Sequence, residues 1–307
     1  MLILIAGITG NIGSKCAASA IRREHTVRGL GRNPDKLDES IRSKLEGFVT
    51  SSSYYDIPAL ERAVDGVDAV ICAYGPIPEL FVDGQLHLLR AAERAGVKRF
   101  CADAWNMDWT RMQLGDHEVM DPFICFKQHV SVSSSIKPCY VLTGVFVEVF
   151  FSVKGHGHFS PANHGVYDPE TKTMDVWGTG EEKYDMTTEE DIGEYTIEII
   201  TAQDSEKGGV FRVCSGQYSA KDIQKTYLKV RGVQLGWKQM GSLEDLQKTA
   251  ISARKENKAP HYWGYIGYFY NLYMLKGWAA LQSLDVTKYP GVKRTDLEAY
   301  LEKHPEV

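Results

Sequence analysis

The feature that most constrains the fold is a glycine-rich segment that follows a short apolar run at the start of the chain. The run Leu2–Ala6 leads directly into Gly7-Ile-Thr-Gly-Asn-Ile-Gly13, and a helical pattern with small side chains begins near Ile12. Glycines allow a tight turn, and the backbone N–H groups at the start of a helix can bind a diphosphate. The pattern therefore predicts a dinucleotide site contacted by Gly7, Thr9, Gly10, Asn11, Ile12 and Gly13.

Further apolar runs predict the rest of a sheet. They lie at 69–73, 98–102 and 140–142, with weaker candidates at 26–30 and 47–50, and helical patterns separate them. One such helix, at about 83–95, is closed by Gly96. Strands that alternate with helices favour a Rossmann-type α/β fold, a parallel sheet with helices on both faces.

The alternation stops after about residue 150. Asp168-Pro-Glu170 predicts a hairpin turn, Thr188-Glu-Glu-Asp191 predicts the start of a helix, and the last hundred residues are expected to be mainly helical. We expect residues 1–150 to form the cofactor-binding domain and 151–307 a smaller, mainly helical substrate region. Part of that region, about 185–215, is expected to pack back on the first domain.

Charge and composition narrow the class of partner. The 35 Lys and Arg against 40 Asp and Glu leave a net charge of −5, which gives no field for attracting nucleic acid or an anionic membrane. No apolar run has the length or flanks of a signal peptide or a membrane span. We expect a cytoplasmic protein with a small-molecule partner, and the six dispersed cysteines indicate buried thiols.

The choice between NAD and NADP is expected to be made after the second strand. The chain there reads Gly29-Leu-Gly-Arg32-Asn-Pro-Asp-Lys36. Arg32 and Lys36 can pair with a 2′-phosphate, whereas Asp35 can either accept hydrogen bonds from a ribose or start a helix. We favour NADP(H) over NAD.

Two segments of the second half are candidates for a functional role. Residues 262–284 are unusually aromatic, which is compatible with core packing, a homodimer surface or a pocket for a flat ligand. His156-Gly-His158, with His164 nearby, invites a metal reading, but no carboxylate or cysteine follows at ligand spacing. No metal site is expected, and we interpret this histidine segment as a loop beside the substrate.

Taken together, these residues resemble the NmrA-like branch of the atypical short-chain dehydrogenases, and within it the isoflavone-reductase-like enzymes. The resemblance spans nearly the whole chain, and its landmarks are the glycine motif, Arg32, residues 85–100, Lys127, residues 188–193 and residues 289–293. It implies NADPH bound along the carboxyl ends of the strands, with substrate held between that domain and the later region. Residues at such strand ends are Ala73, Tyr74, Gly75, Gly144 and Phe146.

The resemblance also implies a catalytic lysine on the helix after the fifth strand, and Lys127 is the matching residue. Phe123-Ile-Cys-Phe-Lys127 reads like the Tyr-x-x-x-Lys of ordinary short-chain dehydrogenases with phenylalanine in place of tyrosine. Lys127 can bind the nicotinamide ribose or donate a proton. After the fifth strand the reductases continue Pro-Ser-Glu-Phe-Gly, whereas this chain has Ala-Asp-Ala-Trp-Asn from Ala102 to Asn106. Asp103 in this segment and His129 on the following helix are further candidates for an acid or a base.

The expected function is NADPH-dependent reduction of a small aromatic, phenolic or polyketide-like metabolite by hydride transfer. Two alternatives stay open: an NADP-sensing regulator without turnover, as NmrA itself is, and a non-redox isomerase, dehydratase or cyclase. Lys127 favours the enzyme, whereas the altered segment after the fifth strand favours the alternatives.

Overall fold

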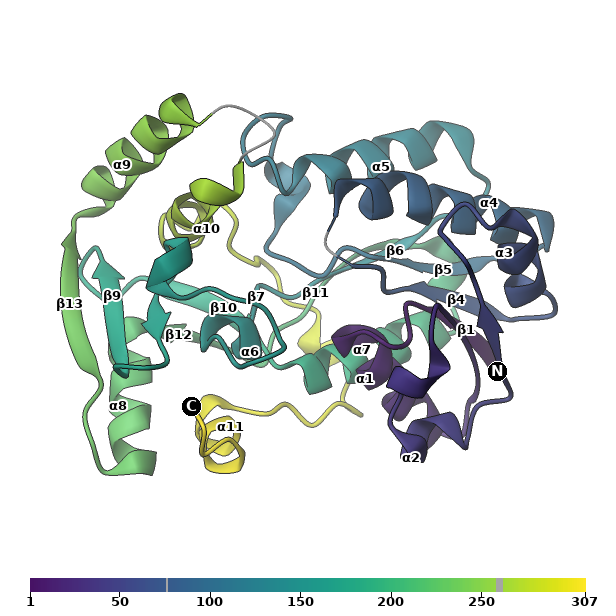
Figure 1. Ribbon diagram of the computed structural model, residues 1–307, viewed down its shortest axis with the longest axis horizontal. Coiled ribbons are helices and arrows are strands. Elements are labelled where there is room, and N and C mark those ends of the chain that lie inside the picture. The colour runs from purple at the N-terminus through teal and green to yellow at the C-terminus, as the bar shows by residue number, and fades with distance from the viewer. Residues whose placement is uncertain (76, 258–261) are drawn as a thin grey trace.

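The computed structural model describes residues 1–75, 77–257 and 262–307. Its largest feature is a seven-stranded parallel sheet in the order β11-β6-β5-β4-β1-β2-β3 (Figure 1). The strands are β1 (Leu2–Ala6), β2 (Thr26–Gly31), β3 (Gly47–Thr50), β4 (Ala69–Cys72), β5 (Arg99–Ala102), β6 (Cys139–Leu142) and β11 (Gly209–Arg212). The strand order reverses between β1 and β4, and the carboxyl end of such a reversal is where open α/β sheets bind ligands.

Helices cover both faces of this sheet. Alternate side chains of β1 point to opposite sides, so that Ile3 and Ile5 belong to one apolar core and Leu4 and Ala6 to another. The first face packs under α1 (Asn11–Arg22) and α7 (Glu189–Thr201), and the second packs under α3 (Ile57–Val64), α4 (Gln85–Arg94) and α5 (Asp121–Ser133) (Figure 1). The short α2 (Glu39–Arg42) follows β2. The predicted Rossmann-type fold is confirmed.

Helices α1 and α7 approach unusually closely. A Cβ on Gly193 would lie 2.7 Å from the carbonyl carbon and oxygen of Lys15, so this position in α7 accepts only glycine. At the far end of α1, Arg23 pairs with Glu194 at 2.7 Å and also with Glu198. The predicted start of α7 is present, because the Thr188 hydroxyl accepts the Asp191 N–H.

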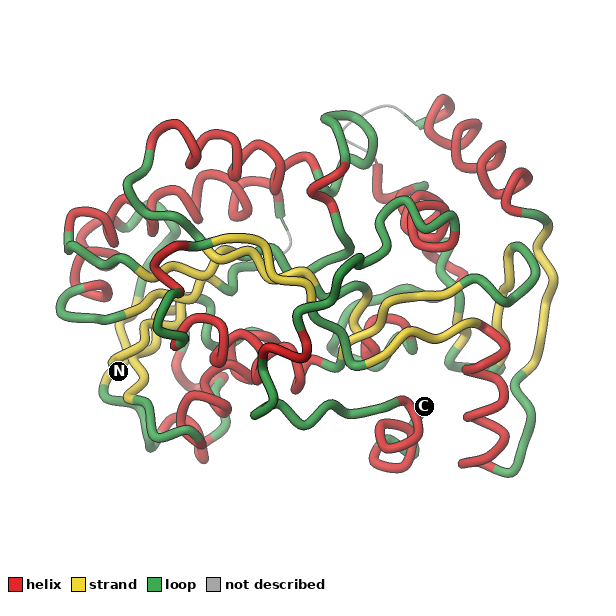
Figure 2. The backbone as a smooth tube through the Cα atoms, turned by 180° about the vertical axis from the view of Figure 1, so that it is seen from behind, coloured by secondary structure: helices red, strands yellow, loops and turns green. Residues whose placement is uncertain are grey.

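The later part of the chain forms two three-stranded sheets and further helices. One sheet joins β7 (Val145–Phe146), β10 (Lys183–Thr187) and β12 (Gly216–Ser219), and the other joins β8 (Tyr167–Asp168), β9 (Thr173–Trp177) and β13 (Gly236–Gly241). Seen from behind, these sheets lie at the opposite end of the molecule from the large sheet (Figure 2). The helices are α6 (Val147–Phe150), α8 (Ala220–Arg231), α9 (Leu243–Glu256), α10 (Ile266–Leu275) and α11 (Leu297–Lys303). The hairpin expected around Asp168 is present as β8 and β9.

The second half of the chain is less uniform than expected in two respects: it contains strands among its helices, and part of it belongs to the large sheet. Although most of the last hundred residues outside loops are helical, β11, β12 and β13 also lie there. The strand β11 completes the large sheet and α7 completes one of its helical layers, so both come from beyond residue 150. A division of the chain at residue 150 therefore stays a proposal.

One of the six cysteines corrects the expectation that all are buried thiols. Cys16, Cys72, Cys101, Cys139 and Cys214 are buried, but Cys125 is exposed. Cys125 lies on α5, whose buried side carries Ile124 and Phe126, and the helical repeat turns position 125 to solvent. No described helix is long and apolar enough to cross a bilayer.

Candidate cofactor and substrate site

The glycine motif forms a bend that only glycines can make. Gly7 has φ of +77°, and a Cβ there would lie 2.0 Å from the carbonyl oxygen of Ala73. A Cβ on Gly13 would lie 2.4 Å from the carbonyl oxygen of Gly7. The bend is therefore pressed against the end of β4, at the place where the strand order reverses.

The amino end of α1 begins inside this bend and is open to an anion. Gly10 is the N-cap, and within the described residues no side chain caps the helix and no acidic residue stands in its first turn. The first N–H groups of a helix have no intrahelical acceptor and carry partial positive charge. Such a cradle, with exposed Gly10 at its centre, fits the diphosphate of a dinucleotide.

The side chains after β2 are arranged for a phosphate rather than for a bare ribose. Arg32 and Lys36 are exposed, and neither has an ion-pair partner among the residues that the structure describes. Asp35, the residue that could instead serve a ribose, pairs with Arg42 at 2.7 Å. Two cations thus stay available at the end of β2, while the competing carboxylate is already engaged.

The other cofactor candidates lie in or just after strands at this end of the sheet. Ala73, Tyr74 and Gly75 follow β4, Gly144 follows β6, and Phe146 is the last residue of β7 in the neighbouring small sheet. The glycine at 144 has a second explanation, because a Cβ there would lie 2.1 Å from the Asp185 carbonyl oxygen of β10. Their contact with a cofactor stays a prediction.

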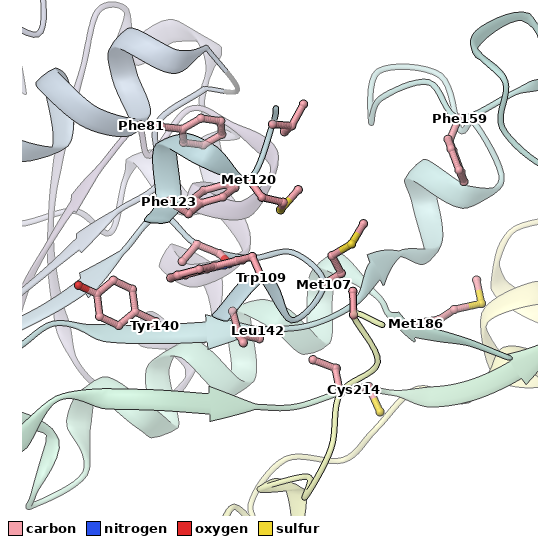
Figure 3. Close-up of a cluster of buried hydrophobic side chains, with 14 of the residues drawn as sticks. Phe81, Met107, Trp109, Met120, Phe123, Tyr140, Leu142, Phe159, Met186 and Cys214 are labelled. Carbon is pink, nitrogen blue, oxygen red and sulfur yellow. The ribbon is translucent and has the colours of Figure 1, made fainter. Parts of the chain in front are cut away.

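Lys127 lies on α5 and is half-buried. Its ammonium forms no ion pair or hydrogen bond within residues 1–75, 77–257 and 262–307. The ring of Phe123, one turn earlier, is buried between Phe81, at 4.6 Å between ring centroids, and Trp109, at 5.7 Å (Figure 3). Position 123, where ordinary short-chain dehydrogenases have the tyrosine, thus carries an apolar ring stacked in the core.

The two other acid–base candidates have contrasting surroundings. Asp103 is buried at the end of β5, burial raises its pKa well above the ordinary range, and its Oδ2 has no partner among the described residues. His129 is exposed and, two residues from Lys127 on α5, lies about 200° away around the helix. Asp103 can hold a proton at the carboxyl edge of the sheet, whereas His129 faces away from the direction of Lys127. Both roles stay predictions.

The three histidines of the 156–164 segment have separate partners. His156 Nδ1 lies 2.8 Å from Glu189 Oε2, His158 contacts Ser160 at 3.2 Å, and His164 Nε2 lies 3.0 Å from the Gly264 carbonyl oxygen. Within the described chain, no group of three His, Cys, Asp or Glu side chains is arranged to hold a metal. The loop instead contacts the glycine bend, since Asn11 Nδ2 donates to the Gly155 carbonyl oxygen at 3.0 Å.

Sequence reasoning missed a buried pair of carboxylates beside this loop. Glu148 of α6 accepts the Glu189 N–H at 3.1 Å, and both side chains line a cavity of about 170 Å³ with Lys15 and His304. Burial, reinforced by Glu189, raises the pKa of Glu148 to about 8. Burial also raises the pKa of Glu189, which His156 opposes. The two glutamates are 41 residues apart, so no local pattern could reveal them.

This pair predicts a pH-dependent stability. The folded protein holds the Glu148 proton more tightly than an unfolded chain with a pKa near 4.5 does. Its stabilising contribution is complete below that pH and is lost as pH rises toward about 8. Glu148→Gln keeps an acceptor for the Glu189 N–H without a charge, so its melting temperature should exceed the wild-type value by a margin that grows between these pH values.

Differential scanning fluorimetry across this pH range provides the measurement. Glu170→Gln is the matched control, since Glu170 is exposed in the turn between β8 and β9. A margin that stays constant with pH would contradict a raised pKa at Glu148.

The aromatic segment contains a second group that the sequence did not single out. Tyr270 of α10 places its hydroxyl 3.4 Å from Asn106 Nδ2, and the Asn106 carbonyl oxygen accepts the N–H groups of Thr143 and Gly144 just beyond β6. The ring of His117 packs edge-on against Tyr270, with centroids 4.6 Å apart. Part of the aromatic segment thus reaches the carboxyl edge of the large sheet, while Trp263 and Trp278 are exposed.

Comparison with known families and proteins agrees with this architecture. The model of the NmrA-like family matches residues 1–301. The chain belongs to the NmrA-like family. The family resemblance inferred from the glycine motif and the later landmarks is therefore confirmed.

Reductases of plants are among the curated relatives. Pinoresinol reductase 2 of Arabidopsis thaliana is 24% identical over 97% of this chain and 95% of its own length. An isoflavone reductase of Cicer arietinum is 25% identical over 98% of both chains. The predicted likeness to isoflavone-reductase-like enzymes is borne out.

Solved structures show the same fold. Leucoanthocyanidin reductase of Vitis vinifera with NADPH aligns with a TM-score of 0.76 at 19% identity, over 99% of both chains. AtPrR2 with NADP+ and (+)-pinoresinol aligns with a TM-score of 0.74 at 21% identity, over 98% of this chain and 97% of that one. Both relatives hold the cofactor type expected from Arg32 and Lys36.

Proposed function

We propose that this protein is an NADPH-dependent reductase of a small aromatic or phenolic metabolite. The observation that carries the proposal is the glycine bend at the strand reversal, which opens the amino end of α1 toward a diphosphate. Arg32 after β2 is exposed and has no ion-pair partner in the part of the chain that the structure describes. Relatives named as reductases of pinoresinol, isoflavones and leucoanthocyanidin support the substrate class.

In this proposal each element of the site has one task. The α1 amino end holds the diphosphate, and Arg32 and Lys36 hold the 2′-phosphate. NADPH supplies a hydride when bound. Lys127 orients the nicotinamide ribose or gives a proton to the reduced substrate, and α5 contains no tyrosine that could do so instead.

The experiment that tests the function is the consumption of NADPH by purified protein with phenolic substrates. Racemic pinoresinol and a hydroxylated isoflavone are the first probes, with the reduced product identified by mass spectrometry. Substrate-dependent loss of NADPH with a product two hydrogens heavier supports the reductase. Tight NADPH binding without consumption for any aromatic substrate would favour a cofactor-sensing regulator, and a product of unchanged mass would favour an isomerase.

Arg32→Ala is expected to distinguish NADPH from NADH. A charge-assisted hydrogen bond contributes about 1.5–3 kcal/mol, so the variant should bind NADPH roughly tenfold to a hundredfold more weakly. NADH affinity should change little, since NADH lacks the 2′-phosphate. Titration of cofactor fluorescence measures both affinities.

Arg94→Ala supplies the matched control for this measurement. Arg94 is an exposed arginine at the end of α4, paired with Glu61 at 2.9 Å. Its removal should leave both affinities unchanged. Equal losses for NADPH and NADH in Arg32→Ala would remove Arg32 from the phosphate site.

A further inference from the structure

A polar cavity outside the proposed cofactor site lies between four helices. Lys15 of α1, Glu148 of α6, Glu189 of α7 and Tyr300 of α11 line it, together with residues near them, around a volume of about 170 Å³. None of the described residues that line it belongs to the glycine bend or to α5. A cavity of about 150 Å³ is large enough to bind benzene, so this cavity has room for a small organic molecule.

The hydroxyl of Tyr300 is left without a partner beside this cavity. The side chain is 2% exposed, and its hydroxyl forms no hydrogen bond with any described residue. Burial raises the pKa of this phenol, and the charges of Glu148, Glu306 and Glu189 raise it further. The hydroxyl therefore lies near these carboxylates. Leaving a buried polar group unpaired costs about 1–3 kcal/mol, a cost that a bound partner would offset.

Two carboxylates are also buried in the cavity wall. Glu148 is 6% exposed and Glu189 is 1% exposed. Glu148 accepts the Glu189 N–H at 3.1 Å and forms no ion pair within the described chain. Glu189 lies 2.8 Å from His156 and 3.4 Å from the Asn11 amide nitrogen. A buried carboxylate is costly unless it holds a proton or faces a cation, so the cavity offers oxygen acceptors to a positively charged group.

The charge around the cavity is negative overall. Besides the two buried glutamates, the exposed Glu190 and Glu306 line it, against two lysines, Lys15 and Lys303. When all four carboxylates are ionised, two negative charges are left for a ligand to balance. One pair of carboxylates is buried and the other is exposed, so a matching ligand carries positive charge at both ends.

We propose that this cavity binds a short alkyl diamine, with one ammonium group against the buried glutamates and the Tyr300 hydroxyl and the other at the two exposed glutamates. An ammonium group donates three hydrogen bonds, and two carboxylates and a phenol oxygen can accept them. No described group of three His, Cys, Asp or Glu side chains is arranged to hold a metal, which favours an organic cation. This site does not depend on the proposed reductase function.

Calorimetry with 1,4-diaminobutane and the full-length protein tests the proposal. This diamine has as many non-hydrogen atoms as benzene, and 1-aminobutane and 1,4-butanediol are matched ligands with one charge and none. Hydrogen bonds to charged groups contribute about 1.5–3 kcal/mol, so the diamine should bind roughly tenfold or more tightly than either analogue. Equal affinities for the diamine and the diol, or no binding of the diamine, would overturn the proposal.

The pH dependence of binding reports the buried carboxylate directly. Burial and Glu189 raise the pKa of Glu148 to about 8, so the diamine displaces a proton at neutral pH. Affinity should rise up to about tenfold for each pH unit below this value, and calorimetry in buffers of different ionisation enthalpy should count the proton released. His156 and His304 also line the cavity and lose positive charge in the same direction, so a variant must identify the group.

Glu148→Gln identifies it. The variant keeps an acceptor for the Glu189 N–H but should bind the diamine at least about tenfold more weakly at pH 8 and release no proton at neutral pH. Glu170→Gln is the control, because Glu170 is exposed and does not line the cavity. Wild-type affinity and proton release in Glu148→Gln would overturn the proposal.

Tyr300→Phe gives a readout that a purely structural tyrosine would not. The hydroxyl has no partner in the described chain, so its removal should leave the melting temperature unchanged or higher while weakening the diamine roughly threefold to tenfold. Tyr167→Phe is the matched control, because Tyr167 is another buried phenol but does not line the cavity. A lower melting temperature with wild-type affinity would show that the Tyr300 hydroxyl only supports the fold.

Lys15→Met separates a bound diamine from an occupant within the chain. Lys15 lies near both buried glutamates, since its charge lowers the pKa of each. In the proposed site this lysine repels the ligand, so Lys15→Met should strengthen diamine binding relative to wild type. Binding that appears only in Lys15→Met would show that the Lys15 ammonium itself fills the cavity, and would overturn the proposal.

Discussion

Lys127→Ala is expected to lower turnover by about two to four orders of magnitude, the range by which a positioned proton donor or acceptor accelerates a reaction. NADPH affinity should stay close to the wild-type value, because in the proposed site the glycine bend and Arg32 hold the phosphates, at the opposite end of the cofactor. Lys127 is half-buried on α5 with no competing partner in the described chain, so its ammonium is available. Steady-state kinetics and NADPH titration of the same preparation measure the two quantities.

The neighbouring Gln128→Ala is the control for Lys127. Gln128 is exposed on α5, so its truncation tests whether any change to this helix affects turnover. Lys127→Arg asks whether a charge alone suffices, since an arginine stays protonated and cannot exchange a proton. Full activity of Lys127→Ala would remove this lysine from the chemistry.

Gly7→Ala is expected to have the largest effect on cofactor binding. At φ of +77° an alanine costs about 1–2 kcal/mol, and its Cβ would also lie 2.0 Å from the Ala73 carbonyl oxygen. The bend must then move away from β4, taking the first N–H groups of α1 with it. Loss of two charge-assisted bonds of about 1.5–3 kcal/mol each would weaken NADPH roughly a hundredfold or more.

Two further glycines separate strain from contact. Gly66 also has a positive φ, +69°, but nothing lies within 4 Å of a Cβ there, so Gly66→Ala reports the conformational cost alone. If Gly7→Ala fails to fold, Gly10→Ala remains informative, because the nearest atom to its Cβ is the Gly7 carbonyl oxygen at 3.3 Å. Wild-type NADPH affinity in Gly10→Ala would place the diphosphate elsewhere.

The large sheet was predictable because its signals are local. Four of the first six strands, β1, β4, β5 and β6, follow from short apolar runs, whereas β2 and β3 gave weaker signals. The strand β1 is followed at once by glycines and a helix of small residues. The strand β11 was not predicted, because Gly-Val-Phe-Arg holds only two apolar residues, and its place in the sheet depends on its parallel pairing with β6. Of the small sheets, only the hairpin of β8 and β9 was predicted. The strand β7 is two residues long and pairs with β10 about forty residues later, so no local pattern reveals it.

The site was predictable where a motif carries it and hidden where distant residues meet. The glycine bend and Arg32 were predicted from their position after strands, and Asp35, the residue behind the competing interpretation of that segment, pairs with Arg42. Glu148 with Glu189, and Asn106 with Tyr270, are pairs 41 and 164 residues apart. Their chemistry depends on burial, which periodicity along the chain does not measure. The exposed Cys125 shows the converse: its neighbours in sequence, Ile124 and Phe126, are buried, but the helical repeat turns Cys125 to solvent.

The contact of Gly193 with Lys15 has a consequence for how the protein is made. Helix α1, whose amino end is the proposed diphosphate site, is covered by α7, and the edge of the sheet is closed by β11. A ribosome must therefore synthesise about two-thirds of the chain before that layer can assemble. A fragment ending near residue 150 would expose the apolar side of α1 and the flank of β6 to water. The nucleotide-binding half is therefore not a detachable module, and its stability and that of the distal half are expected to rise and fall together.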